Sequence, residues 1–159
     1  MVNETFESPV INFKNLHVLT DYFQQAHMRT AGGQVRHIIL SEEGFTSDSI
    51  SRGKVYDIQA AAFAYAYYLV DNNPYIDAFI LNRQVDAITE VETSCAFGLW
   101  TVDMSRPDKV IAVMPKNIYQ VFKHIDTRKS LRYSEFAKSI VGISDWSEVI
   151  PGFDPEKYQ

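Results

Sequence analysis

The chain has 159 residues, of which 46% are hydrophobic and 22% charged, a composition typical of a globular domain that can bury a core. Its net charge of −5 argues against a dedicated nucleic-acid surface, which needs a clustered basic face. No apolar run is long enough to predict a membrane span, and the N-terminus lacks the pattern of a signal peptide. The single cysteine, Cys95, excludes an internal disulfide and a multi-thiolate metal site.

The first part of the chain is predicted to contain a helix and a buried strand. Residues 1–12 form a polar, turn-like segment, and the predicted domain covers 13–159. From Phe13, hydrophobic residues recur at steps of three and four, which predicts an amphipathic helix: Leu16, Leu19, Phe23 and Ala26. After a glycine turn, the segment from Val35 to Leu40 ends in a continuous apolar run, typical of a strand buried on both faces of a parallel sheet.

A second helix and strand follow a polar loop over 45–56. An alanine-rich stretch from Asp57 to Val70 predicts a long helix, because alanine is the best helix former. The sequence Asp71-Asn72-Asn73-Pro74 ends it, and Ile76 to Leu81 is the second short apolar strand.

The C-terminal part is predicted to be mainly helical. A polar loop over 82–93 leads to an extended or hairpin element over 97–103. Pro115 is predicted to open a helix with a buried face of Ile118, Val121, Phe122 and Ile125. A last helix near 134–141 stops at Gly142, and an irregular tail with Trp146 and Pro151 packs back on the body.

Helices and strands therefore alternate, which indicates an α/β architecture with a parallel sheet. Only two strands are clear, and both are apolar on two faces. A two-stranded parallel sheet cannot shield itself from water, so we expect the chain to be part of something larger, with exposed strand edges that favour self-association.

The most informative polar residue is Glu42, directly after the first strand. Alternation along the strand places Ile38, Leu40 and Glu42 on one face and Glu43 on the other. A carboxylate at the C-terminal end of a barrel strand points into the mouth where active sites form, and Gly44 lets the backbone turn or a ligand approach. The alternative is that both glutamates are solvated residues at the start of a loop.

Several segments, in order, resemble the C-terminal part of retaining TIM-barrel glycoside hydrolases. In those enzymes the seventh strand ends in Thr/Ser-Glu-x-Gly, which Ser41-Glu42-Glu43-Gly44 matches, so the resemblance implies Glu42 as the nucleophile. Further matching segments are Ile76-Asp77-Ala78-Phe79-Ile80-Leu81, like the eighth strand, Phe97-Gly98-Leu99-Trp100, and Pro115-Lys116-Asn117-Ile118-Tyr119. The chain looks closest to an uncharacterised bacterial family of glycoside-hydrolase-like barrels, filed under a domain-of-unknown-function name.

The resemblance implies a partial (β/α)8 barrel, from about the sixth helix to the eighth, with two parallel strands. A complete barrel needs about 250 residues. The acid/base glutamate, expected in an Asn-Glu dipeptide after the fourth strand, has no counterpart, because the only Asn-Glu is Asn3-Glu4. We therefore expect a fragment of a longer protein, inactive alone by the two-carboxylate route, whose parent is exported by a signal outside this chain; the compartment is not fixed by the sequence.

Other residues are candidates for substrate binding. Asn82 and Arg83 follow the second strand and are predicted to share the mouth with Glu42, where Arg83 could pair with Glu42 or, in a purely structural alternative, with Asp86. Trp100, and more weakly Phe45, could stack on a sugar ring, or pack in the core. The four histidines lack metal-ligand spacing, and no cofactor is predicted.

Three functions remain open. The first is a retaining glycoside hydrolase acting on O-glycosidic bonds of a poly- or oligosaccharide. The second is a non-catalytic carbohydrate-binding remnant that keeps the cleft aromatics. The third is a small self-contained α/β interaction domain.

Overall fold

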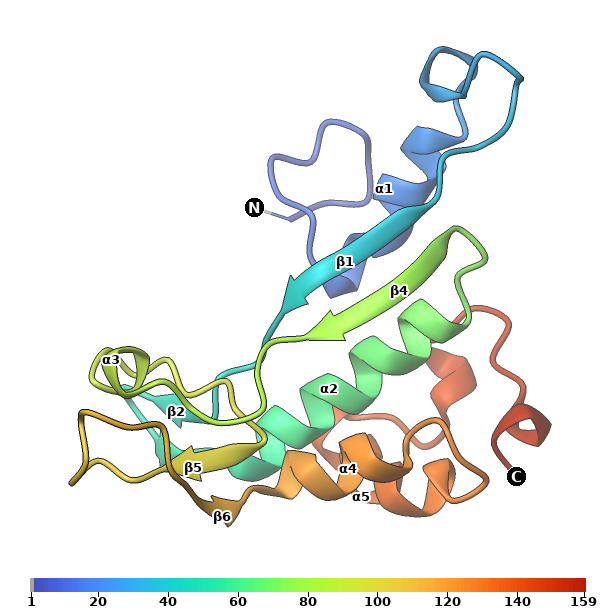
Figure 1. The fold of residues 1–159 in the computed structure, drawn as a ribbon. Helices are drawn as coiled ribbons and strands as arrows, with labels where there is room; N and C mark the ends of the chain where they lie inside the picture. The colour runs from blue at the N-terminus through green and yellow to red at the C-terminus, as the bar shows by residue number, and fades with distance from the viewer. Residues whose placement is uncertain (1) are drawn as a thin grey trace.

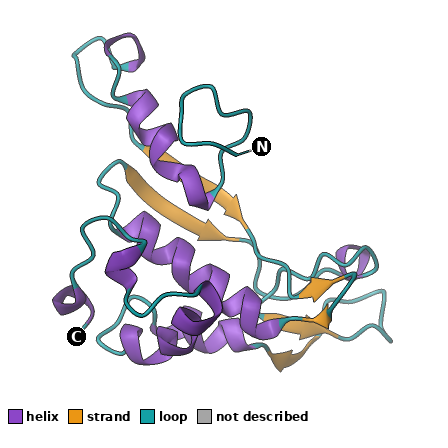
Figure 2. Cartoon of the chain, turned by 180° about the vertical axis from the view of Figure 1, so that it is seen from behind, coloured by secondary structure: helices purple, strands orange, loops and turns teal. Residues whose placement is uncertain are grey.

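The computed structural model describes residues 2–159 as a mixed α/β protein with five α-helices and one parallel pair of strands (Figure 1). The elements are α1 (Leu16–Phe23), β1 (Ile38–Glu43), β2 (Asp48–Ser49), β3 (Gly53–Lys54), α2 (Tyr56–Asp71), β4 (Ile76–Leu81), α3 (Ile88–Val91), β5 (Trp100–Val102), β6 (Ala112–Pro115), α4 (Asn117–His124) and α5 (Ser130–Val141). Figure 2 shows β2, β3, β5, β6 and α3 gathered at one end of the molecule, beyond the arrowheads of β1 and β4.

The two predicted apolar strands lie side by side and run in the same direction, connected by α2 (Figure 1). Leu40 pairs with Phe79 and Glu43 pairs with Leu81, with a register shift between the two pairs. The prediction of a parallel pair is confirmed. The second strand has the predicted bounds, whereas β1 begins three residues later than expected and continues to Glu43.

One face of the β1–β4 sheet is covered by helices. The ring of Phe79 lies 5.8 Å from that of Phe63 in α2 and 5.7 Å from that of Phe13, just before α1. The opposite face is open: Ile39 and Ile80 keep 60% and 53% of their surface exposed. The prediction that both faces are buried is therefore wrong for the described residues.

The main core lies between α2, α4 and α5. Ala60 and Ala64 on α2 are fully buried, because a small side chain lets neighbouring elements approach closely. The hydroxyl of Tyr68 lies 2.7 and 2.8 Å from those of Ser130 and Ser134, so this buried polar atom is satisfied. Trp146 packs 4.8 Å from the Tyr68 ring, which confirms that the tail returns to the body.

The structure corrects the predicted elements in several places. Pro115 ends β6 instead of opening a helix, and α4 begins at Asn117. The extended element over 97–103 is half of an antiparallel hairpin, β5–β6. The predicted loop over 45–56 contains the β2–β3 hairpin, and the loop over 82–93 contains α3. The last helix starts at Ser130 and stops, as predicted, at Gly142, whose φ of +86° suits a residue without a Cβ.

Candidate functional site

The C-terminal ends of β1 and β4 meet at one edge of the sheet. The backbone N–H of Asn82 donates to the carbonyl oxygen of Glu43 at 2.6 Å, so the chain leaving β4 is tied to the last residue of β1. Glu42 on one strand and Asn82 and Arg83 after the other are therefore brought to the same end of the sheet, as the sequence predicted.

The two glutamates at this end point to opposite faces, and the register shift in β1 decides which face each takes. Paired residues of parallel strands share a face, so Leu40, opposite Phe79, and Glu43, opposite Leu81, lie on the helix-covered side. Glu42, next to Glu43, then lies on the open side with Ile39, and its side chain is exposed. The prediction that Leu40 and Glu42 share a face is wrong, because it assumed unbroken alternation.

Glu43 sits in an apolar environment. It borders a cavity of about 210 Å³ whose other walls include Ile11, Phe13, Leu16 and Leu40. Removal from water disfavours the charged form, and this burial raises the pKa of the Glu43 carboxyl group above its usual value. Glu43 is thus partly buried beside apolar side chains, whereas Glu42 is exposed to solvent.

Arg83 forms an ion pair that the sequence did not predict. Its Nη2 donates to Oε1 of Glu90 in α3 at 2.6 Å. Neither proposed partner, Glu42 or Asp86, receives this contact. About a third of each side chain remains exposed, so the pair adds little stability and leaves part of the guanidinium open to solvent. The peptide bond between Asn82 and Arg83 is cis.

Asp86 is instead part of a buried polar cluster beneath the strand ends. Lys116 Nζ donates to the carboxylate of Asp86 at 2.6 Å, to the hydroxyl of Ser47 at 2.9 Å and to the carbonyl oxygen of Ala96 at 3.1 Å. The same carboxylate accepts the backbone N–H of Gly98 at 2.7 Å. Burial lowers the pKa of the Lys116 ammonium, and the bond to Asp86 opposes that effect. Sequence reasoning missed this cluster, although Lys116 belongs to the Pro-Lys segment of the resemblance.

A second buried side chain fixes the loops that follow the strands. Gln59, on the first turn of α2, donates from Nε2 to the carbonyl oxygens of Phe45 at 2.8 Å and of Ala96 and Gly98 at 3.3 Å. Gln59 lies in α2 and Lys116 directly precedes α4, and because both donate to the carbonyl oxygen of Ala96, they tie the loops to the helical core.

The predicted contacts Arg83 and Trp100 are brought together in one cavity. This cavity, of about 300 Å³, is lined by Leu81, Arg83, Gln84, Leu99, Trp100, Tyr119 and Phe122. The rings of Trp100 and Tyr119 meet edge to face with centroids 5.2 Å apart. The lining combines aromatic rings, an amide and a guanidinium group, which suits a ligand with both apolar faces and hydroxyl groups.

Phe45 does not line this cavity. Its ring lies 5.4 Å from that of Phe13, and it packs against the main core. No group of three or more His, Cys, Asp or Glu side chains that could hold a metal ion occurs within residues 2–159. Within the same residues, no helix has the length and apolar character needed to cross a membrane.

Comparison with models of protein families shows to which family the chain belongs. A model described as a family of unknown function (DUF5722) matches residues 1–149. The chain belongs to this family. No curated protein and no solved structure matches the chain. Membership of DUF5722 agrees with the expected uncharacterised family, and it assigns no activity to the strand-end site.

Proposed function

We propose that this chain supplies the nucleophile of a retaining glycoside hydrolase, with Glu42 in that role. The observation that supports it is the position of Glu42: exposed, at the C-terminal end of a parallel strand, beside a strand that leads directly into Asn82 and Arg83. Active sites of parallel α/β barrels form at this end of the strands, where side chains from several strands converge.

The open face of the β1–β4 sheet supports a second part of the proposal, that the two strands belong to a (β/α)8 barrel. In a barrel, helices cover the outer face of each strand and the strands enclose the inner face. Here α1 and α2 cover one face, while Ile39, Ile80 and Glu42 lie on the other. We assign the sheet to the seventh and eighth strands of a (β/α)8 barrel, so that Glu42 faces its mouth.

The reaction requires a second carboxylate. A retaining enzyme attacks the anomeric carbon with one carboxylate, and a second, about 5 Å away, protonates the leaving oxygen and later activates water. The sole Asn-Glu dipeptide does not qualify, because Glu4 pairs with His17 at 3.1 Å near the N-terminus. The proposal therefore takes the acid/base from polypeptide outside residues 1–159.

A second candidate function is carbohydrate binding without hydrolysis. The cavity that holds Trp100 and Tyr119 favours it, because its lining has stacking surfaces and polar donors but no carboxylate. In this reading Arg83 and Asn82 bond sugar hydroxyls, Trp100 stacks on a ring, and Glu42 is a solvated residue.

Covalent trapping tests the nucleophile. The full-length parent protein that contains residues 1–159 is incubated with 2-deoxy-2-fluoroglycosyl fluorides of several sugar configurations, whose fluoride leaves without help from an acid, and labelled peptides are located by mass spectrometry. We expect the label on Glu42. Glu42→Gln should abolish labelling, and the matched variant Glu43→Gln should retain it.

Two other outcomes have clear meanings. A label on a different carboxylate, or none with any sugar configuration, overturns the nucleophile role. If labelling fails while the chain still binds oligosaccharides by calorimetry, and Trp100→Ala removes that binding, the non-catalytic function stands instead.

A further inference from the structure

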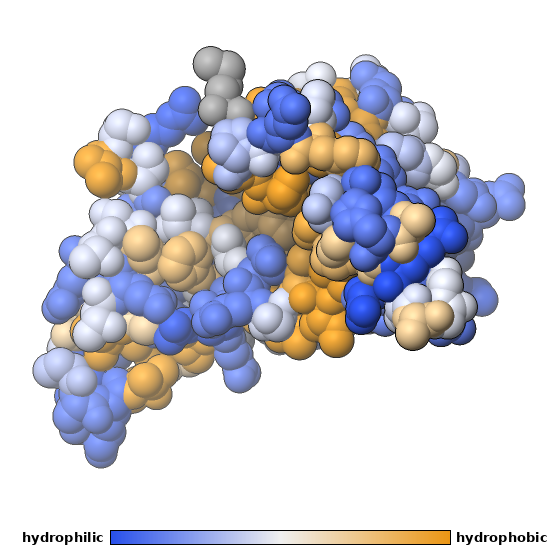
Figure 3. Space-filling model, turned by 90° about the horizontal axis from the view of Figure 1, so that it is seen from above, coloured by the Kyte–Doolittle hydropathy of each residue, from blue (hydrophilic) through white to orange (hydrophobic). Residues whose placement is uncertain are grey.

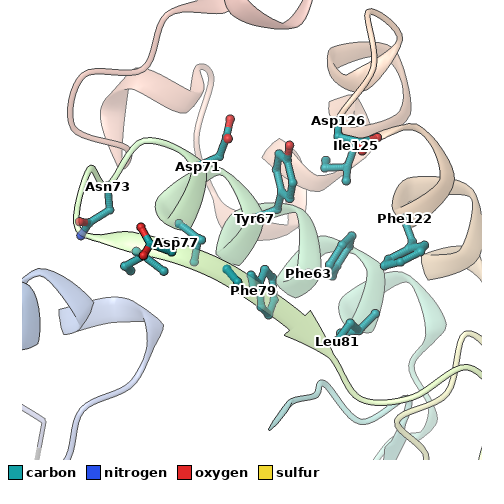
Figure 4. A pocket seen from close by; sticks show the side chains of 13 residues that line it. Phe63, Tyr67, Asp71, Asn73, Asp77, Phe79, Leu81, Phe122, Ile125 and Asp126 are labelled. Atoms are coloured by element: carbon teal, nitrogen blue, oxygen red, sulfur yellow. The ribbon is translucent and has the colours of Figure 1, made fainter. Parts of the chain in front are cut away.

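The cavity that holds Arg83 and Trp100 is built partly on regular elements and partly on irregular segments. Leu81 and Phe122, which also border the larger cavity of about 370 Å³ drawn in Figure 4, lie on β4 and α4. Arg83 instead lies in the loop after β4, and Trp100 opens β5, a strand of three residues. The placement of these two candidate ligand contacts therefore depends on what holds the irregular segments.

The segments of Arg83 and Trp100 pair along their backbones. The N–H of Leu99 donates to the carbonyl oxygen of Arg83 at 3.1 Å. The N–H of Trp100 donates to the carbonyl oxygen of Gln84 at 3.0 Å, and the N–H of Asp86 donates to that of Trp100 at 3.0 Å. The two segments form a short parallel ladder, so a displacement of one of them displaces the other.

Lys116 attaches this ladder to the rest of the molecule. Its backbone N–H donates to the carbonyl oxygen of Leu99 at 2.9 Å, and its side chain is fully buried. The ammonium group has three N–H donors, and three acceptors surround it, on Asp86, Ser47 and Ala96. These acceptors lie in the loop after β4, in the loop after β1 and in the segment before β5, so one side chain joins all three.

Stability alone does not account for a charged pair at this place. Replacing a buried ion pair by apolar residues of similar size is often neutral or stabilising, because removing both charges from water costs about as much as their attraction returns. What Lys116 and Asp86 supply is direction, since a hydrogen bond weakens steeply when its acceptor moves out of line. Neither side chain borders the cavity, so any effect on a ligand passes through Arg83 and Trp100.

We infer that Lys116 is a positioning residue for the candidate carbohydrate site. Through Asp86 and its own backbone, it sets where the Trp100 ring stands relative to the Arg83 guanidinium group. Tyr119, whose ring meets that of Trp100, donates its N–H to the carbonyl oxygen of Lys116 at 3.0 Å, so the second aromatic wall is fixed to the same residue. This role rests on the proposed function, because it assumes that Arg83 and Trp100 contact a carbohydrate.

Fluorine NMR of the full-length protein that contains residues 1–159, produced with 5-fluorotryptophan, tests the role. The signals of Trp100 and Trp146 are assigned from the Trp100→Phe and Trp146→Phe variants. Trp146 is buried in the main core and reports on the fold as a whole. The decisive protein combines Lys116→Met with Asp86→Asn, which leaves no buried charge unpaired. We expect the Trp100 signal to shift or broaden in it, while the Trp146 signal stays unchanged.

Two milder variants complete the set. Ser47→Ala removes one acceptor of the Lys116 ammonium group and leaves the ion pair, so it should move the Trp100 signal less than the double variant does. Lys54→Met removes a neighbouring cation that pairs with Asp48 in the β2–β3 hairpin, and it should move neither signal.

The outcomes separate a positioning role from a purely structural one. An unchanged Trp100 signal in the double variant overturns the inference, and so does a shift of both tryptophan signals in a folded variant. If the double variant does not fold, Ser47→Ala decides by the same criteria.

Carbohydrate chemistry gives a second readout. With a 2-deoxy-2-fluoroglycosyl fluoride that labels the full-length protein, the double variant should need about tenfold more reagent for half-maximal labelling rate, since misplacement by about 1 Å costs up to about 100-fold. Equal demand by both proteins, despite a displaced Trp100 signal, overturns the link to the ligand. If the unaltered protein neither reacts with these fluorides nor binds oligosaccharides, the proposed function fails, and the fluorine signals still decide whether Lys116 positions Trp100.

Discussion

Glu43 and Glu42 are adjacent in sequence and have different surroundings, which has a consequence for stability. The apolar cavity beside Glu43 raises its pKa above the usual value of 4.5, so the folded state holds this proton more tightly than the unfolded state does. The stability from protonation is fully present below pH 4.5 and is lost as pH rises through the folded pKa.

We therefore expect Glu43→Gln to flatten the pH dependence of stability. Urea unfolding from about pH 4 to about pH 7 should show the wild type losing free energy of unfolding relative to Glu43→Gln as pH rises. Glu43→Met, also uncharged, should behave like the Gln variant, which separates charge from hydrogen bonding. Identical slopes in all three proteins would contradict the assignment.

The buried pair of Lys116 and Asp86 gives a larger effect. Lys116→Met leaves the Asp86 carboxylate buried with the Gly98 N–H as its remaining partner, and we expect a loss of about 3–5 kcal/mol in urea unfolding. Adding Asp86→Asn removes the unpaired charge and should recover most of that loss. The control Lys54→Met breaks a pair in which the Lys54 side chain is 52% exposed, against 0% for Lys116, and should cost less than Lys116→Met.

At the residue scale, the sequence predicts where the candidate side chains lie in the fold, but it does not predict which side chains they contact. Glu42, Asn82 and Arg83 do meet at one end of the sheet, because parallel strands end together. The partner of Arg83 was not predictable, because Glu90 lies in the short helix α3. The polar segment that contains α3 has the composition of a loop. The face of Glu42 was not predictable either, because a register shift leaves no mark in the pattern of apolar residues.

Elements were predicted best where local chemistry and pairing agree. The bounds of β4 were read directly, since Pro74 precedes it and a polar loop follows. β1 was misplaced at its start because a parallel strand exists only where its partner does, and β4 begins at Ile76. Pro115 suits both a helix start and the end of an edge strand, and tertiary pairing with Trp100 decided for the strand.

The backbone at Gly98 packs directly against the backbone at Val85 and Asp86, and this close approach requires a residue without a Cβ. A Cβ on Gly98 would lie 2.3 Å from the backbone N of Asp86 and 2.6 Å from the carbonyl carbon of Val85, and neither atom can turn aside. We expect Gly98→Ala to cost about 3 kcal/mol or more in urea unfolding. Gly142→Ala, with open space but a φ of +86°, should cost about 1 kcal/mol. Equal losses would show that steric contact is not the cause.

At the scale of the whole molecule, the composition predicted a core, and the structure has one. The apolar strands also predicted that both faces of the sheet are buried. Residues 2–159 bury only one face and leave Ile39 and Ile80 on the other face exposed. Viewed from above, apolar side chains gather at the surface between polar margins (Figure 3). A continuous apolar run indicates that both faces of a strand are covered in the complete protein, and it does not indicate which polypeptide covers them.

Exposure of Ile39 and Ile80 leads to a prediction about where stability resides. Since about half or more of each side chain is already in water, the double change Ile39→Thr and Ile80→Thr should alter the free energy of unfolding by less than about 1 kcal/mol. Ile118→Ala, at a fully buried position in α4, should cost about 2–5 kcal/mol by the same urea measurement. The double variant should also bind the dye ANS less than the wild type, because dye binding reports accessible apolar surface. A double variant as destabilised as Ile118→Ala would mean that the open face is buried in solution, within one chain or between copies.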